Sequence, residues 1–479
     1  MLFNSLQFAV FFPLVTAIYF LLPQRHRVLW LLVSSCVFYM AFIPIYILIL
    51  FVTILIDYFA GMYLEKVQGS ARTGLLWLSI MSTCSVLFVF KYFGFFTTNF
   101  VSVAGLLGWH LPLPAVKIIL PIGLSFHTFQ SLSYVVEVYR GRQKAEPHFP
   151  TYATYVMFFP QLVAGPIERP QHLLHQFWEH HAFDHERIAS GLRRMAWGFF
   201  KKLVMADRLA LYVNDVYAAP QNFNGLQLTL ATFFFAYQIY CDFSGYSDIA
   251  VGAARVLGFR LMENFNTPYF SKSISEFWHR WHISLSSWFR DYLYNPMVER
   301  LVSASGWCFT ILVTFAVSGL WHGANWTYVV WGCLNGTYLL AGAATERPRN
   351  RLFAAFGLGE TAPVRIGIRV ISTFLLTCVG WVIFRARNLP DAWYILTHFW
   401  RNWEFHSITT EQFLLRQMPV AVAGIVLLEI VQLLNGRVRL ADIIVRAPIV
   451  PRWAIYLTCV FSVILFGVFR NTQFIYFQF

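Results

Sequence analysis

The chain has 479 residues, of which 58% are hydrophobic and only 12% are charged, and its formal net charge is +13. Soluble proteins of this length carry about a quarter charged residues, so the composition excludes an ordinary soluble protein and predicts an integral membrane protein. The basic residues are scattered between apolar segments, which is typical of cytoplasmic loops rather than of a nucleic-acid-binding surface.

Apolar segments of about 20 residues are expected to cross the membrane as helices. In the first half of the chain they are residues 6–22, 28–56 (two helices around a turn at Pro44), 75–96 and 116–139. Residues 152–163 are apolar but too short to span. They predict a re-entrant or interfacial segment, because irregular backbone at membrane depth needs a protein-lined cavity.

The second half combines basic, aromatic stretches with further apolar segments. Residues 172–208 predict an amphipathic cytoplasmic helix that leads into a crossing, and residues 260–300 form a long basic and aromatic stretch. Further spans are expected at residues 226–257, 307–318, 321–340, 366–384, 419–434 and 453–469. The sequence therefore predicts an all-α, polytopic membrane protein of a single domain, residues 1–479, with 11 to 12 transmembrane helices plus re-entrant and interfacial helices.

His322 lies at the centre of an apolar run between Gly319 and Gly323. A buried imidazole costs free energy unless it has a partner, and with one partner it can serve as a general base near neutral pH. Asn325 could orient a ring or donate a hydrogen bond to an oxyanion, and Trp321 offers packing surface. From the residues alone, a structural histidine in a helix–helix hydrogen bond is an equally open interpretation.

Two further histidines, His279 and His282, are spaced to share a helix face. Neither an H-E-x-x-H motif nor a C-x-x-C pair occurs, so the sequence predicts no metal site. His279 is followed by Arg280, which suits an interfacial helix. His282 follows Trp281 and precedes apolar residues, which indicates a more embedded position.

Two carboxylates, Asp242 and Asp248, fall inside an apolar segment. Charged groups are costly there, so both must face protein or water, either as a proton or ion relay or as hydrogen-bonded links between helices. Motifs of serine hydrolases and of P-loop nucleotide-binding proteins do not occur in the sequence.

Residues 276–294 and 319–323, which contain His282 and His322, resemble the membrane-bound O-acyltransferase family. The likeness is to the branch of alginate and cellulose O-acetyltransferase membrane subunits, and residues 158–169 and 240–248 also fit it. It implies a ring of helices with a funnel on each face. It also implies that His322 is the catalytic base and His282 the second catalytic histidine.

The resemblance further implies acetyl transfer from a cytoplasmic donor, expected to be acetyl-CoA, to an exopolysaccharide such as alginate or cellulose. The acceptor would be reached directly or through a periplasmic SGNH-type acetyltransferase, in the bacterial inner membrane, next to a polysaccharide synthase or secretion complex. No bound cofactor or metal is expected. The residues expected to bind substrate are Asn325, Trp321, Trp281, Arg280, Lys272 and Asp242. A proton-coupled transporter and a structural subunit of a secretion complex remain the alternatives.

Overall fold

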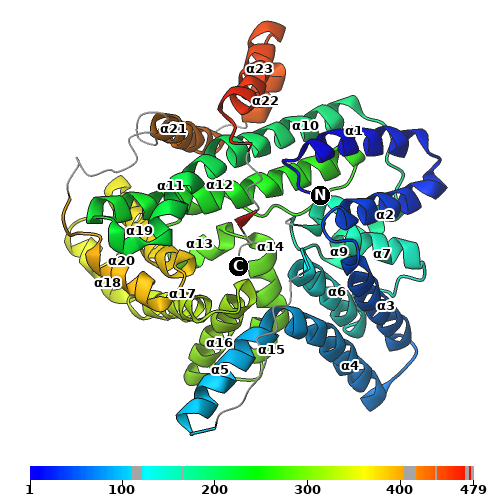
Figure 1. The fold of residues 1–479 in the computed structure, drawn as a ribbon, viewed down its shortest axis with the longest axis horizontal. Helices are drawn as coiled ribbons and strands as arrows, with labels where there is room; N and C mark the ends of the chain where they lie inside the picture. The colour runs from blue at the N-terminus through cyan, green and yellow to red at the C-terminus, as the bar shows by residue number, and fades with distance from the viewer. Residues whose placement is uncertain (110–120, 164, 404–416, 437–439, 470–473, 476–479) are drawn as a thin grey trace. The chain divides into compact units, whose positions relative to one another are not determined.

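The computed structural model describes residues 1–109, 121–163, 165–403, 417–436, 440–469 and 474–475. Within these ranges the regular elements are all helices, which confirms the predicted all-α class (Figure 1). Clustering of contacts divides the chain into two compact units. Unit 1 comprises Met1–Met195 and Ile249–Met262, and unit 2 comprises Ala196–Asp248 and Glu263–Phe479. The single domain expected over residues 1–479 stays a prediction.

Unit 1 contains the N-terminal helices. They are α1 (Leu6–Leu21), α2 (Gln24–Met40), α3 (Tyr46–Leu64), α4 (Gly69–Leu87), the π-helix η1 (Phe88–Tyr92), α5 (Phe93–Leu106), α6 (Leu124–Tyr139), α7 (Phe149–Met157), α8 (Phe159–Leu162), α9 (Pro170–Leu173) and the 3₁₀-helix η2 (Leu174–Trp178). The predicted break at Pro44 is confirmed, because it separates α2 from α3. The short segment 152–163 falls on α7 and α8, which meet at Phe158.

The boundary between the units falls within two helices, α10 (His185–Phe199) and the 33-residue α12 (Gly225–Leu257). Unit 2 also contains the π-helix η3 (Phe200–Ala206), α11 (Asp207–Ala218), η4 (Pro220–Asn222), η5 (Pro268–Phe270), α13 (Ile274–Arg280), α14 (Ile283–Phe289), the π-helix η6 (Arg290–Tyr294), α15 (Asn295–Val298), α16 (Ala304–His322), α17 (Trp326–Ala344), α18 (Glu346–Ala355), α19 (Pro363–Arg385), α20 (Leu389–His398), α21 (Met418–Asn435), α22 (Leu440–Arg446) and α23 (Ile449–Phe466).

Six of the described helices are long and apolar enough to cross a bilayer, and α1 is a shorter apolar helix. The six are Tyr46–Leu64, Gly69–Leu106 (α4, η1 and α5 in one continuous helix), Ala304–His322, Pro363–Arg385, Met418–Asn435 and Ile449–Phe466. These helices confirm a multi-pass membrane protein. The count of 11 to 12 crossings stays a prediction.

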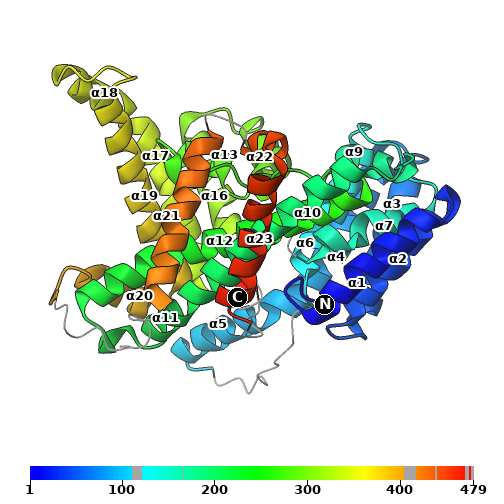
Figure 2. The same cartoon turned by 90° about the horizontal axis from the view of Figure 1, so that it is seen from above.

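Helices α16 and α17 form the antiparallel hairpin that positions His322, and Figures 1 and 2 show them side by side. Glycines at the crossing allow the two backbones to approach closely. A Cβ atom on Gly319 would overlap the Tyr328 carbonyl, and one on Gly332 would overlap the Phe315 carbonyl. The hairpin turns directly after His322, so the predicted interruption between two apolar segments is confirmed.

Candidate active site

His322 is the last residue of α16, and its side chain is buried, with 4% of the residue exposed. Its Nδ1 lies 2.6 Å from the carbonyl oxygen of Ser318, one helical turn earlier. A carbonyl oxygen only accepts hydrogen bonds, so Nδ1 carries a proton, and in the neutral form of the ring the lone pair lies on Nε2. This tautomer is the one that a general base needs.

Aromatic side chains surround the His322 ring. Ring centroids lie 5.0 Å away for Trp321, 4.9 Å for Trp331 and 5.6 Å for Phe384, all in edge-on arrangements. Trp331 is itself only 2% exposed and stacks on Trp381 at 6.0 Å. The enclosure limits water around the imidazole, and in such a site each hydrogen bond to a reacting group is stronger than in bulk water.

His282 lies where α13 and α14 meet, and its backbone has a left-handed φ of 44°. This conformation is uncommon for a residue other than glycine and costs free energy that the surrounding structure must supply. The residue is only 1% exposed. Residues held in such backbone conformations cluster at active sites, which makes His282 a candidate functional residue.

Asn264 holds the His282 ring, with its Oδ1 3.1 Å from Nδ1. The same oxygen accepts hydrogen bonds from the N–H of Ser284 at 3.3 Å and from its hydroxyl at 3.0 Å. The Asn264 amide nitrogen donates to Ser247 at 3.3 Å. Because an amide oxygen only accepts, Nδ1 of His282 is the donor, and the lone pair again lies on Nε2.

The two histidines are neighbours of one aromatic side chain. The ring centroid of Trp321 lies 6.3 Å from His282 and 5.0 Å from His322. Burial lowers the pKa of His282 well below its usual range, and His322 lowers it further. His282 is therefore neutral at physiological pH, with its lone pair on Nε2.

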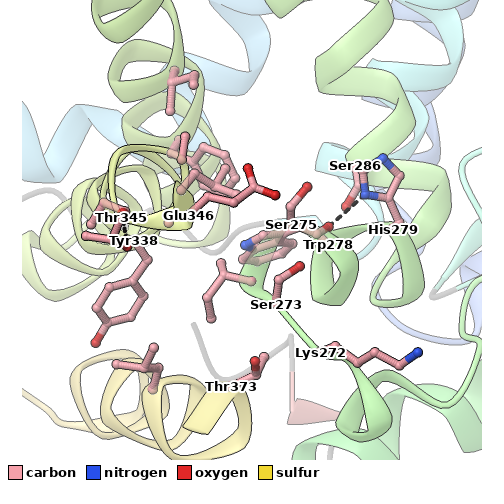
Figure 3. Close-up of a pocket in the computed structure, with 18 of the residues that line it drawn as sticks. Lys272, Ser273, Ser275, Trp278, His279, Ser286, Tyr338, Thr345, Glu346 and Thr373 are labelled. Atoms are coloured by element: carbon pink, nitrogen blue, oxygen red, sulfur yellow. Dashed lines mark hydrogen bonds between the residues drawn. The ribbon is translucent and has the colours of Figure 1, made fainter. Parts of the chain in front are cut away.

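A cavity of about 980 Å³ lies in unit 2 (Figure 3). It reaches the last turn of α16, where Ser318 is one of its lining residues. Its lining includes Ser318, whose carbonyl holds His322, and the indole ring of Trp278. The basic residues that line it are Lys272, His279, Arg290, Arg349, Arg365 and Arg369. Helix α17 runs antiparallel to α16, so its C-terminal end lies far from Ser318. Helix α18 follows that end, and the arginines on α18 (Arg349) and in the first turns of α19 (Arg365 and Arg369) therefore lie at the end of the cavity opposite Ser318. Two carboxylates, Glu346 and Glu360, also line the cavity, and Glu360 lies 4.0 Å from Arg365. The cavity thus extends from an end where arginines outnumber carboxylates toward the buried histidine.

The residues predicted to bind substrate occupy different environments. Lys272 lines the cavity, whereas Arg280 pairs with Glu276 at 2.6 Å and is not among the lining residues. Trp281 is 1% exposed and packs against Phe277 (5.5 Å) and Trp381 (5.0 Å). The binding roles of these residues and of Trp321 stay predictions.

Asp242 is part of a buried ion cluster in unit 2. Its Oδ1 lies 2.6 Å from Nζ of Lys202, which also pairs with Asp207 at 2.8 Å, and its Oδ2 accepts the N–H of Ile475 at 2.8 Å. Asp248 pairs with Lys201 at 2.6 Å. Internally compensated charges of this kind favour the interpretation of Asp242 as a structural link over that of an ion relay. Its role in substrate binding stays a prediction.

Asn325 caps the first turn of α17. Its oxygen accepts the N–H of Thr327 at 3.1 Å, and its amide nitrogen donates to the Arg387 carbonyl at 3.3 Å. Its expected contribution to an oxyanion site stays a prediction. Among the described residues no group of three or more His, Cys, Asp or Glu side chains is arranged to hold a metal ion.

Comparison with known proteins adds a family assignment. The sequence model of "MBOAT, membrane-bound O-acyltransferase family" matches residues 80–356. The chain is 38% identical over 441 residues to the "Probable alginate O-acetylase AlgI" of Azotobacter vinelandii, covering 89% of this chain and 85% of that protein. The protein of the same description from Pseudomonas aeruginosa is 39% identical over 397 residues (82% and 74%). A "Peptidoglycan O-acetyltransferase" of Helicobacter pylori is 31% identical over 395 residues (77% and 72%).

Proposed function

Because the chain belongs to the membrane-bound O-acyltransferase family, we propose that it moves an acetyl group from acetyl-CoA to a hydroxyl group of an exopolysaccharide. The family makes the protein an acyltransferase. The observation that carries the proposal is the pair of buried, Nδ1-protonated histidines, one of which ends the helix that lines a basic cavity.

In the proposed reaction, His322 acts as the general base. Its Nε2 takes the proton of the acceptor hydroxyl as the hydroxyl oxygen attacks the carbonyl carbon of the thioester. The new C–O bond forms, the C–S bond breaks, and the departing thiolate takes the proton from His322, so that an acetyl ester and a free thiol result. His282 positions the donor or assists the proton transfer, and the two fixed rings supply the orientation on which much of the acceleration depends.

The basic cavity supports acetyl-CoA as the donor. Coenzyme A carries several phosphate charges at one end and the thioester at the other. Arginine and lysine are the side chains that commonly bind phosphate. The cavity has its α18 and α19 arginines at one end and Ser318, next to His322, at the other. A donor with its phosphates at the basic end would therefore direct its thioester toward His322.

The acceptor is proposed from the relatives. Two of them are described as alginate O-acetylases and one as a peptidoglycan O-acetyltransferase, so their acceptors are glycans. We propose alginate or cellulose as the polymer, acetylated directly or through a periplasmic SGNH-type acetyltransferase. The proposed setting is the bacterial inner membrane, beside a polysaccharide synthase or secretion complex.

The test uses purified protein in liposomes with radiolabelled acetyl-CoA on one side and alginate or cellulose oligomers on the other, with and without the periplasmic partner. The expected result is release of CoA thiol and appearance of label on the oligomers or on the partner. Proton or oligomer flux without acetyl transfer would contradict the proposal and favour a transporter. Acetylation that persists in membranes without the protein would favour a structural subunit.

Variants of Lys272 and Arg280 distinguish donor binding by the cavity from a general effect of the positive charge on this part of the protein. Lys272→Ala is expected to raise the KM for acetyl-CoA by about three-fold, within the range of one exposed ion pair. The effect should shrink as salt increases, because exposed charges are screened. Arg280→Ala is expected to have a smaller effect, since its guanidinium pairs with Glu276 and does not line the cavity. Steady-state kinetics at two salt concentrations check this order, and equal KM values in wild type and Lys272→Ala would contradict it.

A further inference from the structure

Two arginines lie where helix α19 ends, far from the arginines of the donor cavity. Arg369 lines that cavity, and Arg385 is the last residue of the same helix. At 1.5 Å per residue the two lie roughly 24 Å apart along the helix axis. Figure 2 shows α18 and α20 at opposite ends of α19. Because the donor is proposed to enter past α18, Arg385 and Arg387 lie toward the other face of the membrane, where basic residues are less common than on the cytoplasmic side.

Arg385 is connected to the His322 site through its neighbour in sequence. Phe384 is 1% exposed, and its ring centroid lies 5.6 Å from that of His322. Two residues further along, the backbone carbonyl of Arg387 accepts a hydrogen bond from the amide nitrogen of Asn325 at 3.3 Å. The end of α19 is thus tied to the turn that follows His322, and both arginines lie beside that turn.

The Arg385 guanidinium is held in place by uncharged side chains. Its Nη2 donates to Oδ1 of Asn214 at 2.7 Å, and its Cζ lies 5.6 Å from the ring centroid of Tyr217 and 6.0 Å from that of Phe235. Its Nε is buried and has no hydrogen-bond partner among the described residues. The cation is therefore oriented, while most of its N–H donors remain available.

No acid neutralises these two arginines within the part of the chain that the structure describes, because no carboxylate there forms an ion pair with either of them. Two acids lie on neighbouring elements. Asp391 on α20 accepts a hydrogen bond from Gln221 at 2.8 Å, and Asp215 on α11 is exposed. A cation at a helix C-terminus is favourable, which accounts for Arg385 but not for Arg387, whose exposed side chain lies beyond the helix. An oriented guanidinium without a carboxylate is suited to bind one from a ligand.

We propose that Arg385 and Arg387 bind a carboxylate of the acceptor, so that the acceptor is an acidic polysaccharide of the polyuronate class rather than a neutral glucan. The inference rests on the proposed function, because it names the acceptor class and its binding residues at that site. A polyuronate carries a carboxylate on every sugar, close to its hydroxyl groups. A sugar whose carboxylate pairs with Arg385 has its hydroxyl groups on the side of Phe384 and His322.

The test compares alginate oligomers with cellulose oligomers of equal length as acceptors for the purified full-length protein in liposomes supplied with acetyl-CoA. Arg385→Gln is expected to raise the KM for alginate oligomers by at least about 10-fold, because hydrogen bonds between charged groups are lost. Arg387→Gln, at an exposed position, is expected to raise it about three-fold. The KM for acetyl-CoA and the kcat at saturating acceptor should stay near those of the wild type.

A conservative variant separates charge from structure at Arg385. Glutamine can still donate to Asn214, and Arg385→Lys keeps the positive charge without the fork of donors. Arg385→Lys is expected to give a KM for alginate oligomers between those of the wild type and Arg385→Gln. If Arg385→Gln folds poorly, Arg385→Lys and Arg387→Gln still test the site.

Arg401 provides a matched control. It is exposed, it follows α20, and its backbone carbonyl accepts the N–H of Gly225 at 2.9 Å. Arg401→Gln removes the same charge and is expected to leave the KM for alginate oligomers unchanged. An equal rise in this variant would show that general positive charge, and not a site at the end of α19, attracts the polymer.

A binding measurement without acetyl-CoA distinguishes the site from the reaction. The Kd of alginate oligomers for the protein in detergent is expected to rise in Arg385→Gln and Arg387→Gln as the KM does. Unchanged Kd and KM in both variants, or equal use of cellulose oligomers, would overturn the site and leave the proposed function standing. Transfer only to a protein partner, without alginate binding, would also overturn it. Alginate binding that depends on the arginines, without any acetyl transfer, would contradict the proposed function and leave the site.

Discussion

Replacing His322 by glutamine is expected to lower acetyl transfer by about 10²–10⁴-fold, the usual contribution of a general base, while the protein still inserts and folds. A glutamine amide can donate to the Ser318 carbonyl as Nδ1 of the histidine does, so the link within α16 can be kept. Glutamine cannot take up a proton. The substitution therefore removes the proton acceptor and preserves the hydrogen bond to the Ser318 carbonyl. His322→Ala is expected to be equally inactive.

His279 offers a matched control within the same unit. Its Nδ1 also bonds the carbonyl one turn earlier, at 2.7 Å from the Ser275 oxygen, but the residue is exposed. His279→Gln makes the same chemical change in the same local geometry. Because His279 lines the donor cavity, any effect is expected in the KM for acetyl-CoA, by no more than about three-fold as for an exposed polar contact, and not in kcat. Rates are compared at equal amounts of protein in the membrane. Near-normal transfer by His322→Gln would show that the base assignment is wrong and would make His282 the leading candidate.

The sequence was informative about His322 because the signal there is local. An apolar run interrupted by glycines on both sides of a histidine predicts a helix break, and the structure has that break directly after His322. Helix boundaries marked by proline were predictable for the same reason, as at Pro44. In each case the pattern lies within one or two turns of the feature that it predicts.

Features that depend on distant parts of the chain were not predictable. Arg365 and Arg369 join Lys272 in one cavity only because α19 packs beside α17 and α13. Lys202 lies in a basic stretch that suggested a cytoplasmic surface, yet it is 1% exposed because Asp207 and Asp242 pair with it. Periodicity and charge patterns describe one segment at a time and carry no information on such partners.

Asn264 was missed for a related reason. It lies in an irregular stretch between α12 and η5, where no periodic pattern marks it, and its partners Ser284 and Ser247 are 20 and 17 residues away. Only the folded chain shows that one amide fixes both the tautomer and the orientation of His282. In the structure the positive φ of His282 marks this site, but no sequence pattern reports a backbone angle.

The second large effect is expected at this asparagine. Asn264→Ala should lower acetyl transfer by about 10- to 100-fold, the range known for partners that orient metal-binding imidazoles. His282→Ala, which removes the oriented ring itself, should lower it by at least as much. The effects should not add. If Asn264 acts through the His282 ring, then in the double variant the amide has no ring to orient, and the rate should equal that of His282→Ala alone. Measuring kcat and KM for all three variants checks this.

Asn264 also bonds two serines, so a general loss of packing must be distinguished from a loss of orientation. Ser284→Ala removes one hydrogen bond to the same Oδ1 and leaves the contact to His282 in place. It is expected to lower thermal stability in detergent slightly, since one buried hydrogen bond contributes about 1 kcal/mol, while kcat stays near that of the wild type. A double variant much slower than His282→Ala, or a Ser284→Ala variant as slow as Asn264→Ala, would mean that Asn264 supports the fold around α14. Turnover equal in His282→Ala and the double variant, with Ser284→Ala active, would identify Asn264 as the residue that positions His282 for the reaction.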